Sequence, residues 1–167
     1  MSDFEFLIER AKELGAYDAK IIDTSDIVTG EWVRLKCQYG CKNYNTRLTC
    51  PPYSPTPSQM QKILDEYSTA LLICDLVDHR TPHISYVLEK EISLWDYYKA
   101  YGMANGRCTL CKNKCHIEAC VHPEEARPSI EASGIDVVGT VRNCGFDLQV
   151  NVDGVDKTCF YSILLIE

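Results

Sequence analysis

The sequence has no long apolar run and no excess of basic residues. Its 167 residues carry a formal net charge of −7, which argues against a general nucleic-acid binder. No stretch approaches 18 consecutive apolar residues, so we expect no membrane span. The first fifteen residues carry acids where a secretory signal would carry bases, and they lack its apolar segment. We therefore expect a cytoplasmic protein.

Motifs of the common catalytic sites are also missing. The chain has no GxGxxG after a strand, no P-loop lysine, no GxSxG and no HExxH, so nothing indicates the corresponding nucleotide, hydrolase or zinc-protease chemistry. Paired carboxylates occur, but no setting distinguishes an acid from a base. The sequence therefore leaves open whether the protein is an enzyme.

The composition is that of an ordinary globular domain, with 46% apolar and 25% charged residues. A chain of this length can enclose one sizeable hydrophobic core, so disulfides are not needed for stability. No repeat or biased linker divides it. We expect a single domain over residues 1–167, with a cysteine-rich metal-binding lobe inserted at 107–128.

The order of the predicted elements indicates an α/β fold with a small mixed sheet flanked by helices. Thr56, Pro57 and Gln59 are typical of a helix start, with a capping box and a proline at the first helical position. The apolar run 69–74 predicts a strand that is covered on both faces. The predicted helices are 3–15, 57–67, 81–103, 129–133 and 136–144, and the predicted strands are 19–22, 32–36, 69–74 and 159–166.

The strongest chemical signal is a run of four cysteines, Cys108, Cys111, Cys115 and Cys120, separated by two, three and four residues. In a reducing cytosol, clustered cysteines are more often metal ligands or catalysts than disulfides. Short gaps allow four thiolates to surround one compact inorganic centre, as in ferredoxin-type runs. The surrounding segment has no hydrophobic periodicity. We therefore predict a [4Fe–4S] cluster as the organiser of this lobe.

Zinc is the main alternative cofactor for this run. Structural zinc sites usually divide four cysteines into two pairs with a longer segment between them, and the compact run favours iron–sulfur over that arrangement. Lys112 and Lys114 lie between the cysteines and would favour the thiolate form. His116 and His122 are further possible ligands, although solvated loop histidines are the commoner case. Catalytic or free thiols are the remaining interpretation.

A second group consists of Cys37, Cys41 and Cys50, with gaps of three and eight residues. Three thiolates are one short of a closed site, so either a distant ligand completes it or one position stays open for substrate. Cys144 is the preferred distant ligand, by elimination. The alternative is that these three are buried apolar residues. Cys74 and Cys159 differ from them, because they lie on apolar strands where core packing is expected.

Basic residues gather around both groups, although the chain is acidic overall. Residues 34–50 contain four bases and no acid, and residues 107–122 contain three bases and one acid. This positive charge would compensate an anionic thiolate–metal centre or attract an anionic ligand. Arg34, Lys36 and Arg47 are the candidates for holding an anionic substrate at the group of Cys37, Cys41 and Cys50.

Several of these motifs together resemble a known family. CxxxC, then CPPYSPTP, then CxxCxxxCxxxxC, then PSIEASGID, all within residues 37–140, resemble a family of small prokaryotic proteins described as predicted metal-binding proteins of unknown function, often found in anaerobes. The resemblance implies ligand roles for both cysteine groups, but it implies no reaction. Cys144 is not part of the motif.

Three functions are compatible with these observations. The first is an iron–sulfur protein, with one or two clusters, that serves electron transfer or redox support in anaerobic metabolism and has a redox partner protein. The second is an enzyme with an open-site cluster at Cys37, Cys41 and Cys50 that acts as a Lewis acid on an anionic small molecule. The third is a non-catalytic interaction module in which zinc supplies folding energy.

Overall fold

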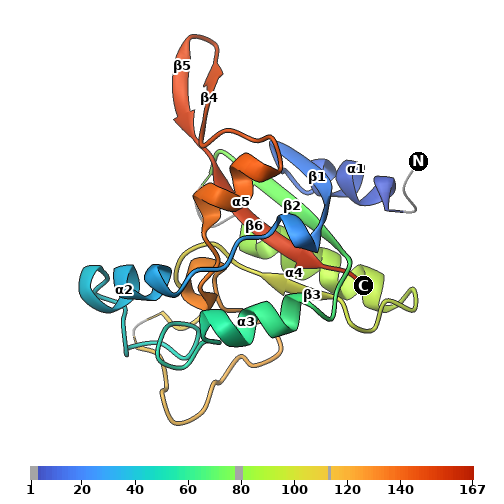
Figure 1. The fold of residues 1–167 in the computed structure, drawn as a ribbon. Helices are drawn as coiled ribbons and strands as arrows, with labels where there is room; N and C mark the ends of the chain where they lie inside the picture. Colours follow the sequence, from blue (N-terminus) through green and yellow to red (C-terminus); the bar gives the residue numbers. More distant parts are fainter. Residues whose placement is uncertain (1–3, 78–80, 113) are drawn as a thin grey trace.

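A four-stranded sheet forms the centre of the molecule (Figure 1). The computed structural model describes residues 4–77, 81–112 and 114–167. The strand order is β1-β2-β6-β3, and every neighbouring pair is antiparallel. The α/β class is confirmed, although the named strands form an antiparallel sheet where a mixed one was expected. The strands are β1 (Asp18–Asp23), β2 (Thr69–Asp75), β3 (Tyr101–Met103) and β6 (Phe160–Leu165).

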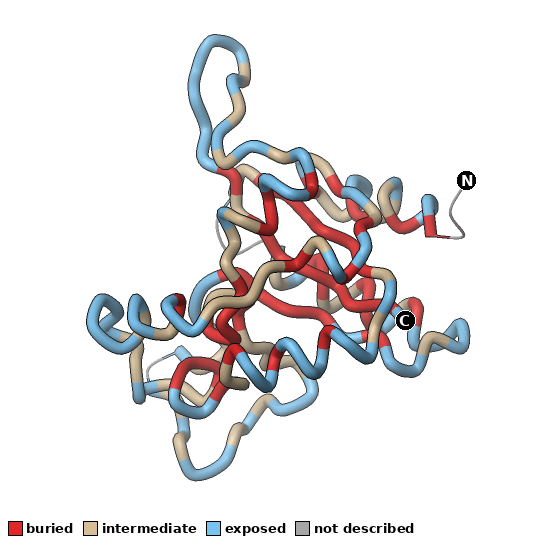
Figure 2. The backbone as a smooth tube through the Cα atoms, viewed as in Figure 1, coloured by how far each residue is buried: buried red, intermediate tan, exposed pale blue. Residues whose placement is uncertain are grey.

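Helices cover both faces of this sheet (Figures 1 and 2). On β2, Leu71 and Ile73 pack in one cluster with α1 (Glu5–Glu13) and α4 (Thr81–Ser93). The alternate residues pack in a second cluster with α3 (Pro57–Leu64) and α5 (Val137–Asn143). Because side chains alternate across a strand, one apolar run supplies both cores. This confirms the expectation that 69–74 is covered on both faces.

Helix α3 begins as its sequence predicts. The Gln59 amide N–H donates to Thr56 Oγ1 at 3.2 Å, and the Thr56 N–H donates to Gln59 Oε1 at 2.9 Å. Pro57 occupies the first turn. These reciprocal bonds satisfy backbone donors that an uncapped helix would leave exposed, and they fix where the segment after Cys50 becomes helical.

Two other predictions were wrong. Residues 32–36 lie in helix α2 (Glu31–Gly40) rather than in a strand. The alternation of apolar and basic residues over these five positions is typical of a strand, but the chain becomes helical after Gly30. In this helix Leu35 is 56% exposed. The helix predicted for 81–103 ends at Ser93, and Trp95 and Tyr98, which lie within the predicted range, are exposed. Its last three residues instead form β3, which pairs with β6.

Gly102 explains how β3 can run so close to α4. A Cβ at this position would lie 2.9 Å from the Ser85 carbonyl oxygen, closer than two unbonded atoms normally approach. Only glycine lets the strand pass beside the helix at this separation.

The remaining elements match the sequence more closely. Helix α1 takes the place of the predicted helix 3–15, whose first residue lies outside the described residues. The short helices end where predicted, at the left-handed residues Gly134 and Gly145. The hairpin β4 (Gln149–Val152) and β5 (Val155–Thr158) was missed, although Asp153-Gly154 between alternating valines is a hairpin signal. The other elements are the 3-10 helices η1 (Thr24–Asp26) and η2 (Glu131–Ser133).

No helix in the described ranges 4–77, 81–112 and 114–167 is both long and apolar enough to cross a membrane.

Candidate metal centre

The cysteine-rich lobe projects from the sheet between two close points of the backbone. The Ala104 N–H donates to the Pro128 carbonyl at 3.0 Å, and the Ile130 N–H donates to the Ala104 carbonyl at 2.9 Å. In the described part of residues 105–127 the chain forms turns and bends without a named helix or strand. The lobe is therefore a long loop whose two ends are joined, in agreement with the irregular segment predicted at 107–128.

A buried ion pair fastens this lobe to helix α4. Arg127 donates to both carboxylate oxygens of Glu89, at 2.9 and 2.6 Å, and the Gly102 N–H donates to the same carboxylate at 2.8 Å. The two side chains are only 10% and 6% exposed. Arg127 also lies 4.9 Å from the centre of the Tyr101 ring, a favourable position for a cation.

Opposing influences set the charge state of Glu89. Burial alone would raise its pKa, but the hydrogen bonds from Arg127 and Gly102 outweigh burial, so the pKa of Glu89 is lowered from its usual value. The carboxylate is consequently ionised at neutral pH. This pair was not predicted from the sequence. The signal that the sequence offered was a glutamate close to the apolar positions Leu88 and Ile92 of a predicted helix.

Cys108, Cys111, Cys115 and Cys120 line one small cavity in the lobe. Its remaining wall includes Arg47, Leu48, Thr49 and His122, which brings the two cysteine-rich parts of the sequence together. The cavity volume is about 10 Å³, which is room for about one water molecule. The structure thus gathers the four predicted ligands around a common but narrow space.

Hydrogen-bond donors face the sulfur atoms of this cavity. The Leu48 N–H donates to Cys115 Sγ at 3.5 Å. Burial raises the pKa of Cys108, and the Leu110 N–H, which bonds to the same sulfur, opposes that rise. Arg47 Nη1 donates to the Cys108 carbonyl at 3.1 Å, while Arg47 Nε is buried without a hydrogen-bond partner. Donors of this kind stabilise thiolates and bound inorganic sulfur.

Cys37, Cys41 and Cys50 are positioned by the end of α2 and the loop after it. Cys37 lies in the last turn of the helix and Cys41 follows its last residue. The Asn43 N–H donates to Cys41 Sγ at 3.4 Å, so this sulfur too accepts a backbone donor. Burial raises the pKa of Cys50 to about 11, with a further rise from Cys41 and an opposing effect of the Thr49 hydroxyl.

Arg34 clamps the segment that follows Cys50. Its Nη1 donates to the Pro55 carbonyl at 2.8 Å, and its Nη2 donates to the Pro52 carbonyl at 3.3 Å. The guanidinium therefore holds the CPPYSPTP motif against α2. Since its donors are used on backbone carbonyls, Arg34 is less available for an anionic substrate than the sequence suggested.

The CPPYSPTP motif also packs on the PSIEASGID motif. Ser54 Oγ donates to the Ala132 carbonyl at 2.5 Å. Gly134 has a φ of +86°, and a Cβ there would lie 2.3 Å from Pro57 Cγ. Both the backbone conformation and the close approach require glycine. The two motifs thus form one structural unit beside the cysteines.

The other three cysteines belong to the core. Cys74 and Cys159 are buried, which confirms their expected packing role, and burial raises the pKa of Cys74 to about 12. Cys144 is 3% exposed and packs in the same hydrophobic cluster. Burial raises its pKa, and the charged groups that act on it are Asp26 and Lys20. Its surroundings are therefore those of the core cysteines rather than those of Cys37 and Cys50.

The histidines and lysines that the sequence placed near the four cysteines differ in their exposure. His122 lines the four-cysteine cavity, whereas His116 is exposed. Lys112 and Lys114 are also exposed. Within the residues that the structure describes, no three His, Cys, Asp or Glu side chains are already arranged to hold a metal ion. Metal binding therefore requires the thiol side chains to turn toward a common centre.

Together, the helix-covered sheet and the cysteine-lined lobe define a cysteine-rich α/β protein. Residues 20–81 and 75–166 match the model of DUF2284, a family described as predicted metal-binding proteins. The chain belongs to this family, which confirms the resemblance carried by its motifs. No curated protein and no solved structure matches the chain.

Proposed function

We propose that Cys108, Cys111, Cys115 and Cys120 bind a [4Fe–4S] cluster. The protein would then serve electron transfer or redox support of a partner enzyme in the cytoplasm of an anaerobe. The observation that carries this proposal is the common cavity of the four thiols together with the donors that face it.

The buried Arg47 Nε is informative because nothing in the described chain satisfies it. An unsatisfied buried donor costs about 1–3 kcal/mol. A thiolate or inorganic sulfide in the adjacent cavity would accept this N–H and would be stabilised by the guanidinium charge. The residues present therefore fit an anionic sulfur-containing group.

The cluster, when bound, supplies one-electron chemistry. The chain's own contributions are the four thiolate ligands, the N–H donors of Leu48 and Leu110, and the charge of Arg47. Hydrogen bonds and positive charge near the sulfurs raise a reduction potential. The lobe would have to widen on binding, because its present cavity has room for about one water molecule.

Zinc is a second candidate, and the small cavity favours it. A single ion with Zn–S bonds of about 2.3 Å needs less space than a cluster. Zinc would make the lobe a structural module that binds a partner, with the metal stabilising its fold.

The group of Cys37, Cys41 and Cys50 supports a further site. Cys37, Cys41 and Cys50 could hold a second cluster with one open position, which would make the protein an enzyme acting on an anionic small molecule. The N–H donated to Cys41 favours metal binding there. The use of Arg34 on backbone carbonyls does not favour an anionic substrate.

Anaerobic purification followed by iron, sulfide and zinc analysis tests the main proposal. We expect iron and sulfide in equal amounts and a brown protein. Cys111→Ser should remove one cluster's iron and sulfide, whereas the core variant Cys159→Ala should retain all of it. A colourless protein that contains one zinc per chain and no sulfide would contradict the iron–sulfur proposal and support the zinc one.

A further inference from the structure

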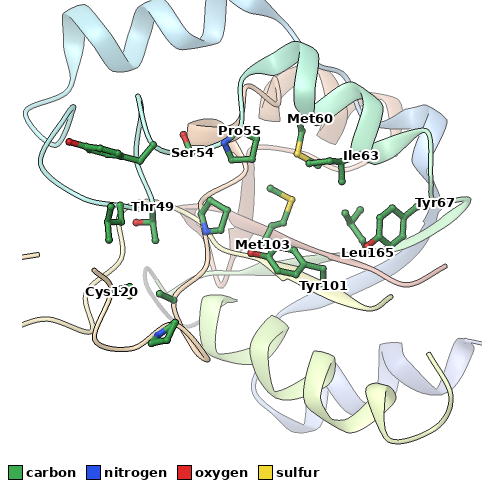
Figure 3. A pocket seen from close by; sticks show the side chains of 15 residues that line it. Thr49, Ser54, Pro55, Met60, Ile63, Tyr67, Tyr101, Met103, Cys120 and Leu165 are labelled. Atoms are coloured by element: carbon green, nitrogen blue, oxygen red, sulfur yellow. The ribbon is translucent and has the colours of Figure 1, made fainter. Parts of the chain in front are cut away.

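A larger cavity adjoins the four-cysteine cavity. It lies below helix α3, with Met60 and Ile63 above it and Met103 and Leu165 of the sheet opposite (Figure 3). Its volume is about 500 Å³, within the range of small-molecule sites. The two cavities share four lining residues, namely Leu48, Thr49, Cys120 and Ala126.

The lining of this larger cavity favours a neutral and mainly apolar occupant. Among the described residues that line it, none is Lys, Arg, His, Asp or Glu. Three tyrosine rings and two methionine side chains offer aromatic and polarisable contacts. Two of the tyrosine hydroxyls are already engaged, since Tyr53 donates to Asn45 Oδ1 at 2.9 Å and Tyr67 donates to the Lys99 carbonyl at 2.7 Å.

Thr49 supplies a buried polar group beside this cavity. The residue is 9% exposed, and its Oγ1 is buried with no hydrogen bond of normal geometry. Burial raises the pKa of the adjacent Cys50 thiol and the Thr49 hydroxyl opposes that rise, although no hydrogen bond of normal geometry joins the two groups. Because buried hydroxyls are normally paired, an acceptor on a bound molecule would complete the site.

We infer that this cavity binds a neutral, mainly aromatic small molecule that carries a carbonyl-type acceptor, with the acceptor at Thr49 and next to the four-cysteine cavity. The apolar lining would hold the ring, and the hydroxyl would fix its orientation. This inference goes beyond the proposed function, since it depends on the cavity and not on which metal the lobe binds.

Methionine-methyl NMR on the full chain tests it directly. The chain contains three methionines, and two of them, Met60 and Met103, line the cavity. Titration with 2-acetylnaphthalene should shift both of their methyl signals through the ring current. The hydrocarbon 2-isopropenylnaphthalene has nearly the same shape but no acceptor, so it should bind more weakly.

Variants separate the contribution of the Thr49 hydroxyl to binding from that of the apolar lining. Thr49→Val should weaken binding of the ketone about three- to tenfold, the usual worth of one hydrogen bond, and leave the hydrocarbon unaffected. Ile63→Trp should fill the cavity and abolish binding of both probes, whereas Leu94→Trp, at an 85% exposed position, should leave both unchanged.

Three results would overturn the inference: no shift of Met60 and Met103 with either probe, unchanged binding in the Ile63→Trp variant, or unchanged ketone affinity in a folded Thr49→Val variant. If Thr49→Val does not fold, the Ile63→Trp variant decides. Metal analysis of the same samples reports on the proposed function separately, so failure of one can be distinguished from failure of the other.

Discussion

The three cysteines of the core and the four of the lobe have the same side chain but opposite surroundings. Cys74, Cys144 and Cys159 pack among apolar side chains in one hydrophobic cluster, where burial keeps a thiol neutral and unreactive. The lobe cysteines lie in an irregular loop with backbone donors and a buried arginine nearby. The environment, more than the number of cysteines, therefore distinguishes a structural thiol from a candidate ligand.

The sheet and the cysteine-rich lobe also differ in the interactions that hold each of them in place. In the sheet, alternating apolar residues determine which side chains face each helix layer. Among the described residues of 105–127, none belongs to either hydrophobic cluster. Polar contacts hold this part of the lobe, and the Arg127–Glu89 ion pair among them is buried. If this view is correct, single polar substitutions should affect the lobe as strongly as large apolar deletions affect a core.

Breaking the Arg127–Glu89 pair should have the largest effect. Arg127→Met removes the bidentate partner of the buried Glu89 carboxylate and leaves it the Gly102 N–H and the half-exposed Lys90 at 3.5 Å. Removing one partner of a buried ion pair destabilises by about 3–5 kcal/mol. Urea denaturation of the variant and the parent measures the difference. The double variant Glu89→Leu with Arg127→Met removes both charges and should recover part of the loss. A loss below about 1 kcal/mol in Arg127→Met would show that the pair does not anchor the lobe.

A substitution of Arg47 tests the contact between the two cysteine-rich segments, and we expect an effect of intermediate size. Arg47→Met removes the bond to the Cys108 carbonyl and the buried Nε donor. Loss of a supporting contact around metal ligands typically weakens metal affinity about 10–100-fold. Competition with a chelator measures this change. The exposed Arg142 of α5 provides the control, because Arg142→Met should leave metal retention unchanged.

Local and apolar signals could be predicted from the sequence, whereas long-range polar contacts could not. The capping box at Thr56 and the apolar strand 69–74 depend on neighbouring residues, and both were predicted correctly. The strand predicted at 32–36 depended on a pairing partner that the fold does not provide. The four-cysteine run was recognisable because its cysteines are close in sequence. By contrast, Arg47 and Cys108 are 61 residues apart, and no local pattern indicates that they meet.

The ionisation of Glu89 should have the smallest effect on stability, and this effect should change gradually with pH. Its pKa is lower in the folded protein than its ordinary value, so the folded state binds this proton less readily than the unfolded state does. The resulting stability is fully present above the unfolded pKa of about 4.3 and is lost as the pH falls through the folded pKa.

One proton changes stability by at most about 1.4 kcal/mol per pH unit, so the effect should be read as a difference between variants in urea denaturation from neutral to acidic pH. Glu89→Gln should reduce the acid dependence. Glu91→Gln should change it less, because Glu91 pairs with Arg10 at the surface, where both side chains are more than a third exposed. Equal acid dependence in the parent and the Glu89→Gln variant would mean that the carboxylate contributes nothing as an ion, and the lobe would then be held by its shape and its cysteines alone.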